Sequence, residues 1–143
     1  MNSSFLLTEM TIDDIKSVRY LWKKVDFDLS YSDKPVEIQR MIDHNPDLCL
    51  VIKKNSRIIA SLLGGFDGRR GWIHHLAVDP DFQNNNYGTL MMNEITKRFS
   101  QKGVVKLKIE ILEDNKKVID FYKSLGWELR SELTTMSLTL KKL

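Results

Sequence analysis

The stretch from Leu76 to Gly88 has the residue types of an anion-binding turn. An apolar run, Leu76-Ala77-Val78, leads through Asp79-Pro80 into the loop Gln83-Asn84-Asn85-Asn86-Tyr87-Gly88, and a helical pattern follows. Such a loop can point several backbone N–H groups at one place, and the helix dipole adds positive potential there. The loop is therefore a candidate phosphate-binding site. The plain alternative is a simple strand-to-helix connection, in which the asparagines only supply turn geometry, because Asn tolerates left-handed backbone angles.

Three further polar residues suit ligand contact or acid–base chemistry. Asn115 and Tyr122 are seven residues apart in a helical pattern, so they lie near one face of a helix. Taken separately, Asn115 is a helix cap and Tyr122 a core aromatic; beside a phosphate loop, the two could hold a cofactor tail and donate a proton. Glu110 falls on the polar face of a predicted strand, where it is either a solvated carboxylate balanced by Lys106 and Lys108 or a general base.

The remaining reactive side chains predict neither a metal site nor a catalytic nucleophile. His74 and His75 are adjacent in a predicted strand, so we expect them on opposite faces, and His44 is remote in the sequence. No metal site is therefore expected. The single cysteine, Cys49, lies in an apolar run and is expected to be a buried, inert thiol.

The composition favours a globular chain with one domain, residues 1–143. Hydrophobic residues make up 42% and charged residues 29% of the 143, and the net charge is only +3. The basic residues are scattered, so no nucleic-acid partner is expected, and no apolar run is long enough to span a bilayer, so no membrane partner is expected. A single cysteine and the lack of a signal-peptide pattern predict a cytoplasmic protein.

The elements that must position these residues alternate in type, which predicts a mixed α/β fold. Helical patterns begin at Thr11, Pro35, Tyr87 and Asn115, and Gly103 and Gly126 predict the ends of the last two. Gly64-Gly65 predicts a bulge or a close backbone approach. Strands are predicted at 4–7, 48–52, 58–66, 72–78 and 105–111, with a closing hairpin at 127–130 and 134–140.

Taken in order, these pieces resemble the GNAT superfamily of acetyl-CoA-dependent N-acetyltransferases. The resemblance rests on the two N-terminal helices, a hairpin, the strand ending at Pro80, the loop 83–88, Asn115 and the run from Phe121 to Trp127. It covers nearly the whole chain, which is similar to small bacterial GNAT enzymes and, in its second half, to the ribosomal-protein N-terminal acetyltransferase group. It implies an α/β (α+β) fold with a mixed, mainly antiparallel sheet, flanked by about four helices and splayed between the central strands.

The resemblance also implies acetyl-CoA as co-substrate and assigns residues to it. The pantetheine amides would pair with the backbone of Leu76, Ala77 and Val78, and Asn115 would contact the arm. The family loop reads Gln/Arg-x-x-Gly-x-Gly/Ala, so Asn86 replaces a glycine, and we expect it to adopt the required backbone angle at modest cost. The residues implied to hold the pyrophosphate are Gln83, Asn84, Asn85, Asn86, Tyr87, Gly88 and Thr89.

Two residues are implied to act in the reaction itself. Tyr122 matches the family tyrosine that protonates the leaving CoA thiolate. Glu110, five residues before Asn115, matches the glutamate that serves as base in the ribosomal-protein group. The implied reaction is direct acetyl transfer to a primary amine of a small molecule or a peptide. A CoA-binding or regulatory module without catalysis and a plain interaction domain are the alternatives, and the acceptor and the choice between monomer and homodimer stay open.

Overall fold

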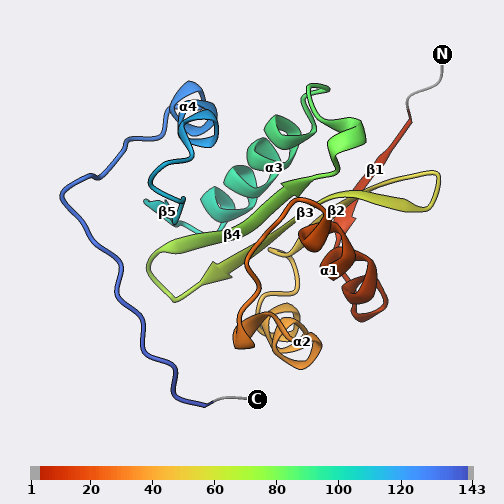
Figure 1. The fold of residues 1–143 in the computed structure, drawn as a ribbon, viewed down its shortest axis with the longest axis horizontal. Helices are drawn as coiled ribbons and strands as arrows, with labels where there is room; N and C mark the ends of the chain where they lie inside the picture. Colours follow the sequence, from red (N-terminus) through yellow and green to blue (C-terminus); the bar gives the residue numbers. More distant parts are fainter. Residues whose placement is uncertain (1–3, 142–143) are drawn as a thin grey trace. The chain divides into compact units, whose positions relative to one another are not determined.

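The strands of the chain form one five-stranded sheet, in the order β1-β2-β3-β4-β5 (Figure 1). The computed structural model describes residues 4–141. These form two units, an N-terminal one that ends at Ile109 and a C-terminal one that begins at Glu110. The C-terminal unit contains α4 (Lys116–Ser124). The N-terminal unit contains β1 (Leu6–Glu9), η1 (Ile12–Asp14), α1 (Ile15–Lys24), η2 (Tyr31–Asp33), α2 (Pro35–His44), β2 (Leu50–Lys54), β3 (Arg57–Phe66), β4 (Gly71–Val78), η3 (Pro80–Phe82), α3 (Tyr87–Gln101) and β5 (Leu107–Ile109).

The sheet is antiparallel from β1 to β4, and only the pairing of β4 with β5 is parallel. That pairing runs from Gly71 opposite Leu107 to Ile73 opposite Ile109. Since β4 continues to Val78, its last residues extend beyond the end of β5. The predicted fold class, a mixed and mainly antiparallel sheet with about four helices, is confirmed.

Helices cover both faces of the sheet, which explains why β2 and β3 read as nearly continuous apolar runs. On one face, α1 and α2 pack on a buried cluster that includes Cys49, Val51 and Leu63. Helix α3, which contains Ile95 and Phe99, lies on the other face (Figure 1). Burial raises the pKa of the Cys49 thiol to about 11, so the expected inert thiol is confirmed.

Gly64 lies where the backbone of β3 approaches the segment before β2. A Cβ at this position would lie 2.6 Å from the carbonyl oxygen of Leu48 and 3.2 Å from Cδ1 of Ile95. The predicted close approach is thus found at Gly64, whereas the two register shifts lie elsewhere, at Ile52/Lys53 of β2 and at Ser61/Leu63 of β3.

We expect Gly64→Ala to destabilise the protein by about 1–3 kcal/mol, because a backbone carbonyl cannot move aside as a side chain can. Gly65→Ala is the matched control, since its Cβ would meet only the flexible end of Met41, at 3.1 Å. Urea unfolding of both variants measures the difference. An equal cost at the two positions would contradict this account.

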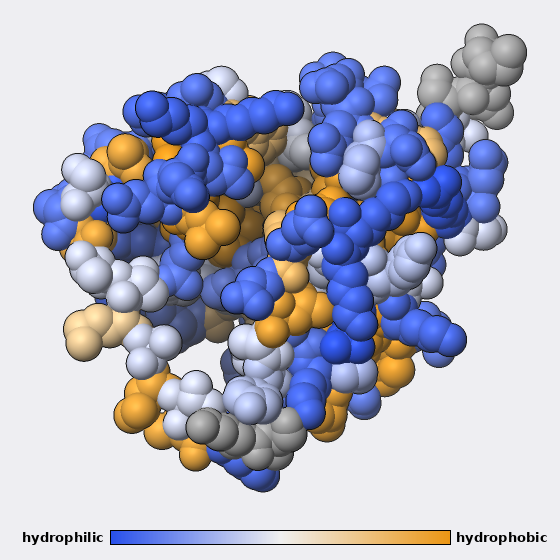
Figure 2. Space-filling model, viewed as in Figure 1, coloured by the Kyte–Doolittle hydropathy of each residue, from blue (hydrophilic) through white to orange (hydrophobic). Residues whose placement is uncertain are grey.

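The predicted closing hairpin does not form among the described residues. Residues 127–130 and 134–140 contain no strand, and Leu129, Leu133, Met136, Leu138 and Leu140 are exposed. Apolar side chains stand out along this C-terminal segment, while hydrophilic residues dominate much of the rest of the visible surface (Figure 2). An alternating pattern forms a strand only where a sheet edge pairs with its backbone and a core covers its apolar face. Two isolated strands are only marginally stable in water.

Candidate functional site

The loop before α3 has the backbone geometry of an anion seat. Asn86 is the N-cap of α3 and has φ 66° and ψ 15°, and Asn84 also has a positive φ of 64°. The expectation that Asn86 supplies the left-handed angle of a glycine is therefore confirmed. Because α3 begins at Tyr87, the N–H groups of its first turn have no acceptor within the helix and are open to a ligand.

The amide side chains of the loop bind the loop's own backbone. Nδ2 of Asn85 donates hydrogen bonds to the carbonyl oxygens of Phe82 and Gln83, at 3.1 and 3.0 Å. Nε2 of Gln83 donates to the carbonyl oxygen of Val78 at 3.0 Å and so ties the loop to the end of β4. These two side chains shape the turn, which leaves the backbone N–H groups as the groups suited to phosphate.

Asp79 anchors the start of the loop, a role that the sequence pattern did not indicate. Its buried carboxylate accepts hydrogen bonds from Nζ of Lys24 in α1 at 3.1 Å and from Nη2 of Arg57 in β3 at 2.8 Å. It also accepts from the N–H of Asp81 at 2.9 Å. A single acidic residue thus joins a helix, a strand and the turn that carries the loop.

Acid should weaken this anchor. Burial acts to raise the pKa of Asp79, but the hydrogen bonds from Asp81, Lys24 and Arg57 outweigh it and hold the pKa below its ordinary value. A depressed pKa contributes stability that is present above the unfolded value of about 3.9 and is lost as the pH falls through the folded value.

We therefore expect the free energy of unfolding to decline below about pH 4. Asp79→Asn should be less stable than the wild type at pH 7, and the difference should shrink at pH 3. Urea unfolding from pH 7 to 3 measures both. A difference that stays constant with pH would show that the Asp79 charge does not contribute.

A β-bulge interrupts β4 at the end of its pairing with β5. His74 lies opposite Leu63 and Ala77 opposite Ser61, so two residues of β4, His75 and Leu76, lie opposite one residue of β3. His75 takes a positive φ of 54°. A bulge turns backbone N–H and C=O groups away from the hydrogen bonds between strands. This bulge lies beyond Ile73, the last residue of β4 that pairs with β5.

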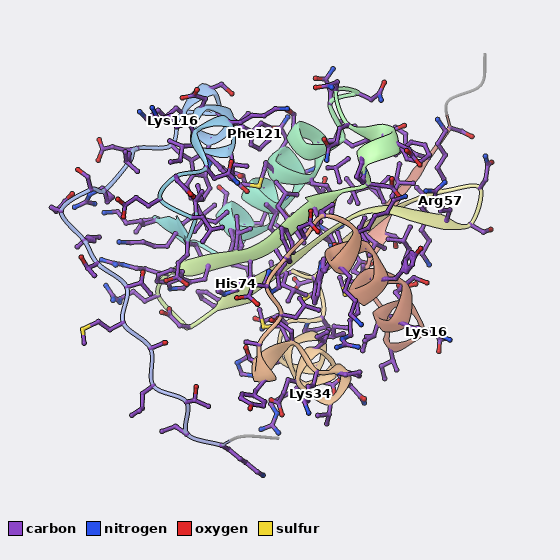
Figure 3. All side chains as sticks on the ribbon, in the orientation of Figure 1. Lys16, Lys34, Arg57, His74, Lys116 and Phe121 are labelled. Carbon is purple, nitrogen blue, oxygen red and sulfur yellow. The ribbon has the colours of Figure 1, made fainter. Side chains whose placement is uncertain are left out.

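The expectation that His74 and His75 point to opposite faces is wrong. His74 shares the face of its partner Leu63, which belongs to the cluster under α1 and α2, and it lies on that side of β4 (Figure 3). His75 contacts Trp22 of α1, so it is on the same face. The extra residue of the bulge breaks the alternation of side chains. Even so, among residues 4–141 no group of three or more His, Cys, Asp or Glu side chains is arranged to hold a metal ion.

The C-terminal unit contains the three other predicted site residues. Asn115 caps α4, since its Oδ1 accepts a hydrogen bond from the N–H of Val118 at 3.3 Å. Tyr122 is only 4% exposed and packs edge-on against Trp127, with ring centroids 5.4 Å apart, and its burial raises the pKa of its hydroxyl. Glu110 is exposed and follows the end of β5, so it lies outside the strand in which it was predicted.

The residues from Leu76 to Thr89 thus come together as one strand, turn and helix start within the N-terminal unit. Asn115 and Tyr122 share one helix and its cap in the C-terminal unit. None of the helices in the described part of the chain has the length and apolar character needed to cross a membrane.

Comparisons with known proteins identify the family of this chain. Residues 15–127 match the model of the acetyltransferase (GNAT) family. An acetyltransferase of Yersinia pestis (strain Pestoides F) is 33% identical over 121 residues, which cover 85% of this chain and 86% of that protein.

Two solved structures share the fold. One is the PaiA N-acetyltransferase of Thermoplasma acidophilum in complex with coenzyme A, with a TM-score of 0.80 at 14% identity, covering 89% of this chain and 91% of that one. The other is the ribosomal-protein-S18-alanine N-acetyltransferase of Escherichia coli, with a TM-score of 0.72 at 18% identity, covering 86% and 77%. The chain therefore belongs to the acetyltransferase (GNAT) family and is an acetyl-CoA-dependent N-acetyltransferase.

Proposed function

We propose that this enzyme transfers the acetyl group of acetyl-CoA to a primary amine by direct attack. The observation that supports this most is the continuous segment from the bulge of β4 to the first turn of α3, in which Asn86 takes the backbone angle of the family's glycine. Cys49 has no part in the reaction, because its thiol is buried and its pKa is raised. No acyl-enzyme is needed.

The backbone of the N-terminal unit would bind the co-substrate. Leu76, Ala77 and Val78 extend past the end of β5, so their outward backbone groups suit the pantetheine amides. The loop from Gln83 to Gly88 and the N–H groups up to Thr89 suit the pyrophosphate, since they combine a left-handed turn with a helix start. Asn115 is proposed to contact the pantetheine arm.

Three groups would then act on the reacting atoms. A primary alkylamine is mostly protonated at neutral pH, so Glu110, directly or through a water molecule, would remove its proton. A backbone N–H of the bulge, near Leu76, would polarise the thioester carbonyl in the manner of an oxyanion hole. Tyr122, whose raised pKa keeps it protonated, would donate its proton to the leaving thiolate.

The acceptor is proposed to be an amine of a small molecule or a peptide. The segment between α1 and α2 contains Asp26 and Asp28, whose negative charges favour a cationic amine. The proposed compartment is the cytoplasm, in keeping with the single, buried cysteine. Both a monomer and a homodimer fit these roles.

A panel of amines tests the proposal, with CoA release as the measured signal. The panel should contain peptides with free N-termini, lysine derivatives, polyamines and amino sugars. We expect one class to release CoA in proportion to the acetylated product, and a thermal shift with CoA alone. A thermal shift without acetyl transfer to any amine would favour a CoA-binding module instead, and the lack of any shift at saturating CoA would refute the proposed cofactor site.

A further inference from the structure

His75 takes a positive φ of 54° inside a strand. Non-glycine residues adopt this region infrequently, although His does so more often than most, and such a conformation persists where the surroundings hold it. The residue also lies beyond the part of β4 that β5 pairs. The contacts of the His75 side chain can therefore hold the bulge in one geometry.

Two aromatic rings hold the imidazole. The ring centroid of Trp22 lies 4.7 Å from that of His75, and the ring of Phe27 stacks on His75 at 5.1 Å. Trp22 is fully buried, and its Nε1 donates a hydrogen bond to Oγ of Ser61 in β3 at 3.0 Å. Since Ser61 lies opposite Ala77, Trp22 is itself fixed next to the bulge.

The turn that ends α1 brings Phe27 to this place. Asp26 takes a left-handed φ of 64°, and the N–H of Phe27 bonds back to the carbonyl oxygen of Trp22 at 3.0 Å. The N–H of Asp26 bonds to the carbonyl oxygen of Lys23, which completes a Schellman motif. The chain thus reverses directly after α1 and passes over His75.

Asp33 connects the same segment to the imidazole. Its Oδ1 lies 2.7 Å from Nε2 of His75, and its Oδ2 accepts a hydrogen bond from the N–H of Ser30 at 2.9 Å. The carbonyl oxygen of Asp33 accepts a further bond from Nε of Arg19 at 2.9 Å. The carboxylate is buried, which acts to raise its pKa, but the hydrogen bonds from His75 and Ser30 outweigh this and hold the pKa below its ordinary value. Because an ionised carboxylate can only accept, Nε2 of His75 donates this hydrogen bond. The side chain of Asp33 therefore bonds both to its own turn and to the bulge.

We propose that Asp33 and His75 form a clamp that joins the segment between α1 and α2, residues 25–34, to the bulge of β4 and fixes the direction of the bulge's backbone N–H groups. The clamp replaces the support that β5 gives to the earlier part of β4. It rests on the proposed function, in which one of these N–H groups polarises the thioester carbonyl. His75 and Asp33 are then positioning residues, because they act through the backbone near Leu76.

The clamp predicts a separation of kcat from cofactor binding. In His75→Ala and Asp33→Ala, kcat should fall by about 10- to 100-fold, because a displaced donor no longer meets the carbonyl oxygen in the transition state. The Kd of CoA should rise by much less than kcat falls, because CoA lacks the acyl carbonyl and its proposed pyrophosphate contacts in the loop 83–88 lie outside the clamp. His75→Gln and Asp33→Asn keep a donor opposite an acceptor and should retain most of kcat. They also serve as the test if an alanine variant does not fold.

Hydrogen–deuterium exchange gives a readout that does not depend on activity. In both alanine variants, amide exchange should quicken in residues 74–78 and in residues 25–34 together. The controls are Asp47→Ala, which removes a surface pair with Lys102, and His44→Ala on the exposed end of α2; both should leave kcat and exchange in these segments unchanged.

Unchanged kcat in well-folded alanine variants would overturn the positioning role, and fast exchange confined to one of the two segments would overturn the clamp. If the wild-type protein acetylates no amine, the proposed function fails, and the exchange experiment still decides whether the clamp exists.

Discussion

Replacing Tyr122 by phenylalanine is expected to lower kcat by about 100-fold or more while leaving the affinity for CoA unchanged. The substitution removes the hydroxyl proton but keeps the ring. That ring packs edge-on against Trp127, and the N–H of Trp127 bonds to the carbonyl oxygen of residue 122, so the end of α4 should stay intact. The loss would therefore be chemical rather than structural.

The environment of Tyr122 keeps its hydroxyl protonated. Burial raises the pKa of the hydroxyl above the ordinary tyrosine value of about 10. The protonated form thus persists through neutral and mildly alkaline pH. It follows that the wild-type rate should not decline between about pH 7 and 9 through ionisation of this residue.

Tyr20→Phe is the matched control, because Tyr20 is an exposed tyrosine on α1 and loses the same hydroxyl. Steady-state kinetics at saturating acetyl-CoA, with isothermal titration of CoA, measure both variants. Turnover in Tyr122→Phe equal to that of the wild type would remove Tyr122 from the mechanism. A parallel loss of CoA affinity would instead assign it to binding.

Features set by neighbouring residues could be predicted from the sequence. Gly103 and Gly126 end α3 and α4 with positive φ angles of 82° and 95°, as their positions indicated. Asn86 and Asn115 were predicted to supply a left-handed angle and a helix cap, and the structure confirms both. Each of these outcomes depends on a few consecutive residues, so local propensity is enough to determine it.

Features set by pairing between distant segments could not be predicted in this way. The contact of His75 with Asp33 joins residues 42 apart, and that of Lys24 with Asp79 joins residues 55 apart. The bulge at His75 is a property of the register with β3, so the alternation of β4 alone gave the wrong faces for the two histidines. The prediction of a closing hairpin was wrong for the same reason. Its residue pattern is typical of strands, but the pattern does not specify which strand would pair with it.

Asn86 should be the most sensitive position of the proposed pyrophosphate loop to a change of backbone preference. Asn86→Val is expected to weaken CoA binding by about 10- to 100-fold, because a β-branched residue at φ 66° costs on the order of 1–3 kcal/mol and would turn the first N–H groups of α3 away from a common point. Asn86→Gly should bind CoA as well as the wild type or better, since glycine adopts this angle freely.

The paired variants separate backbone geometry from side-chain chemistry. Asn55 has a φ of 52° in the turn between β2 and β3, so Asn55→Val imposes a similar strain outside the loop. It should lower the melting temperature while leaving the Kd of CoA unchanged. If Asn86→Gly lost affinity as severely as Asn86→Val, the amide of Asn86 would have to contact the ligand itself, and the loop would bind through this side chain rather than through the backbone groups that its left-handed angle exposes.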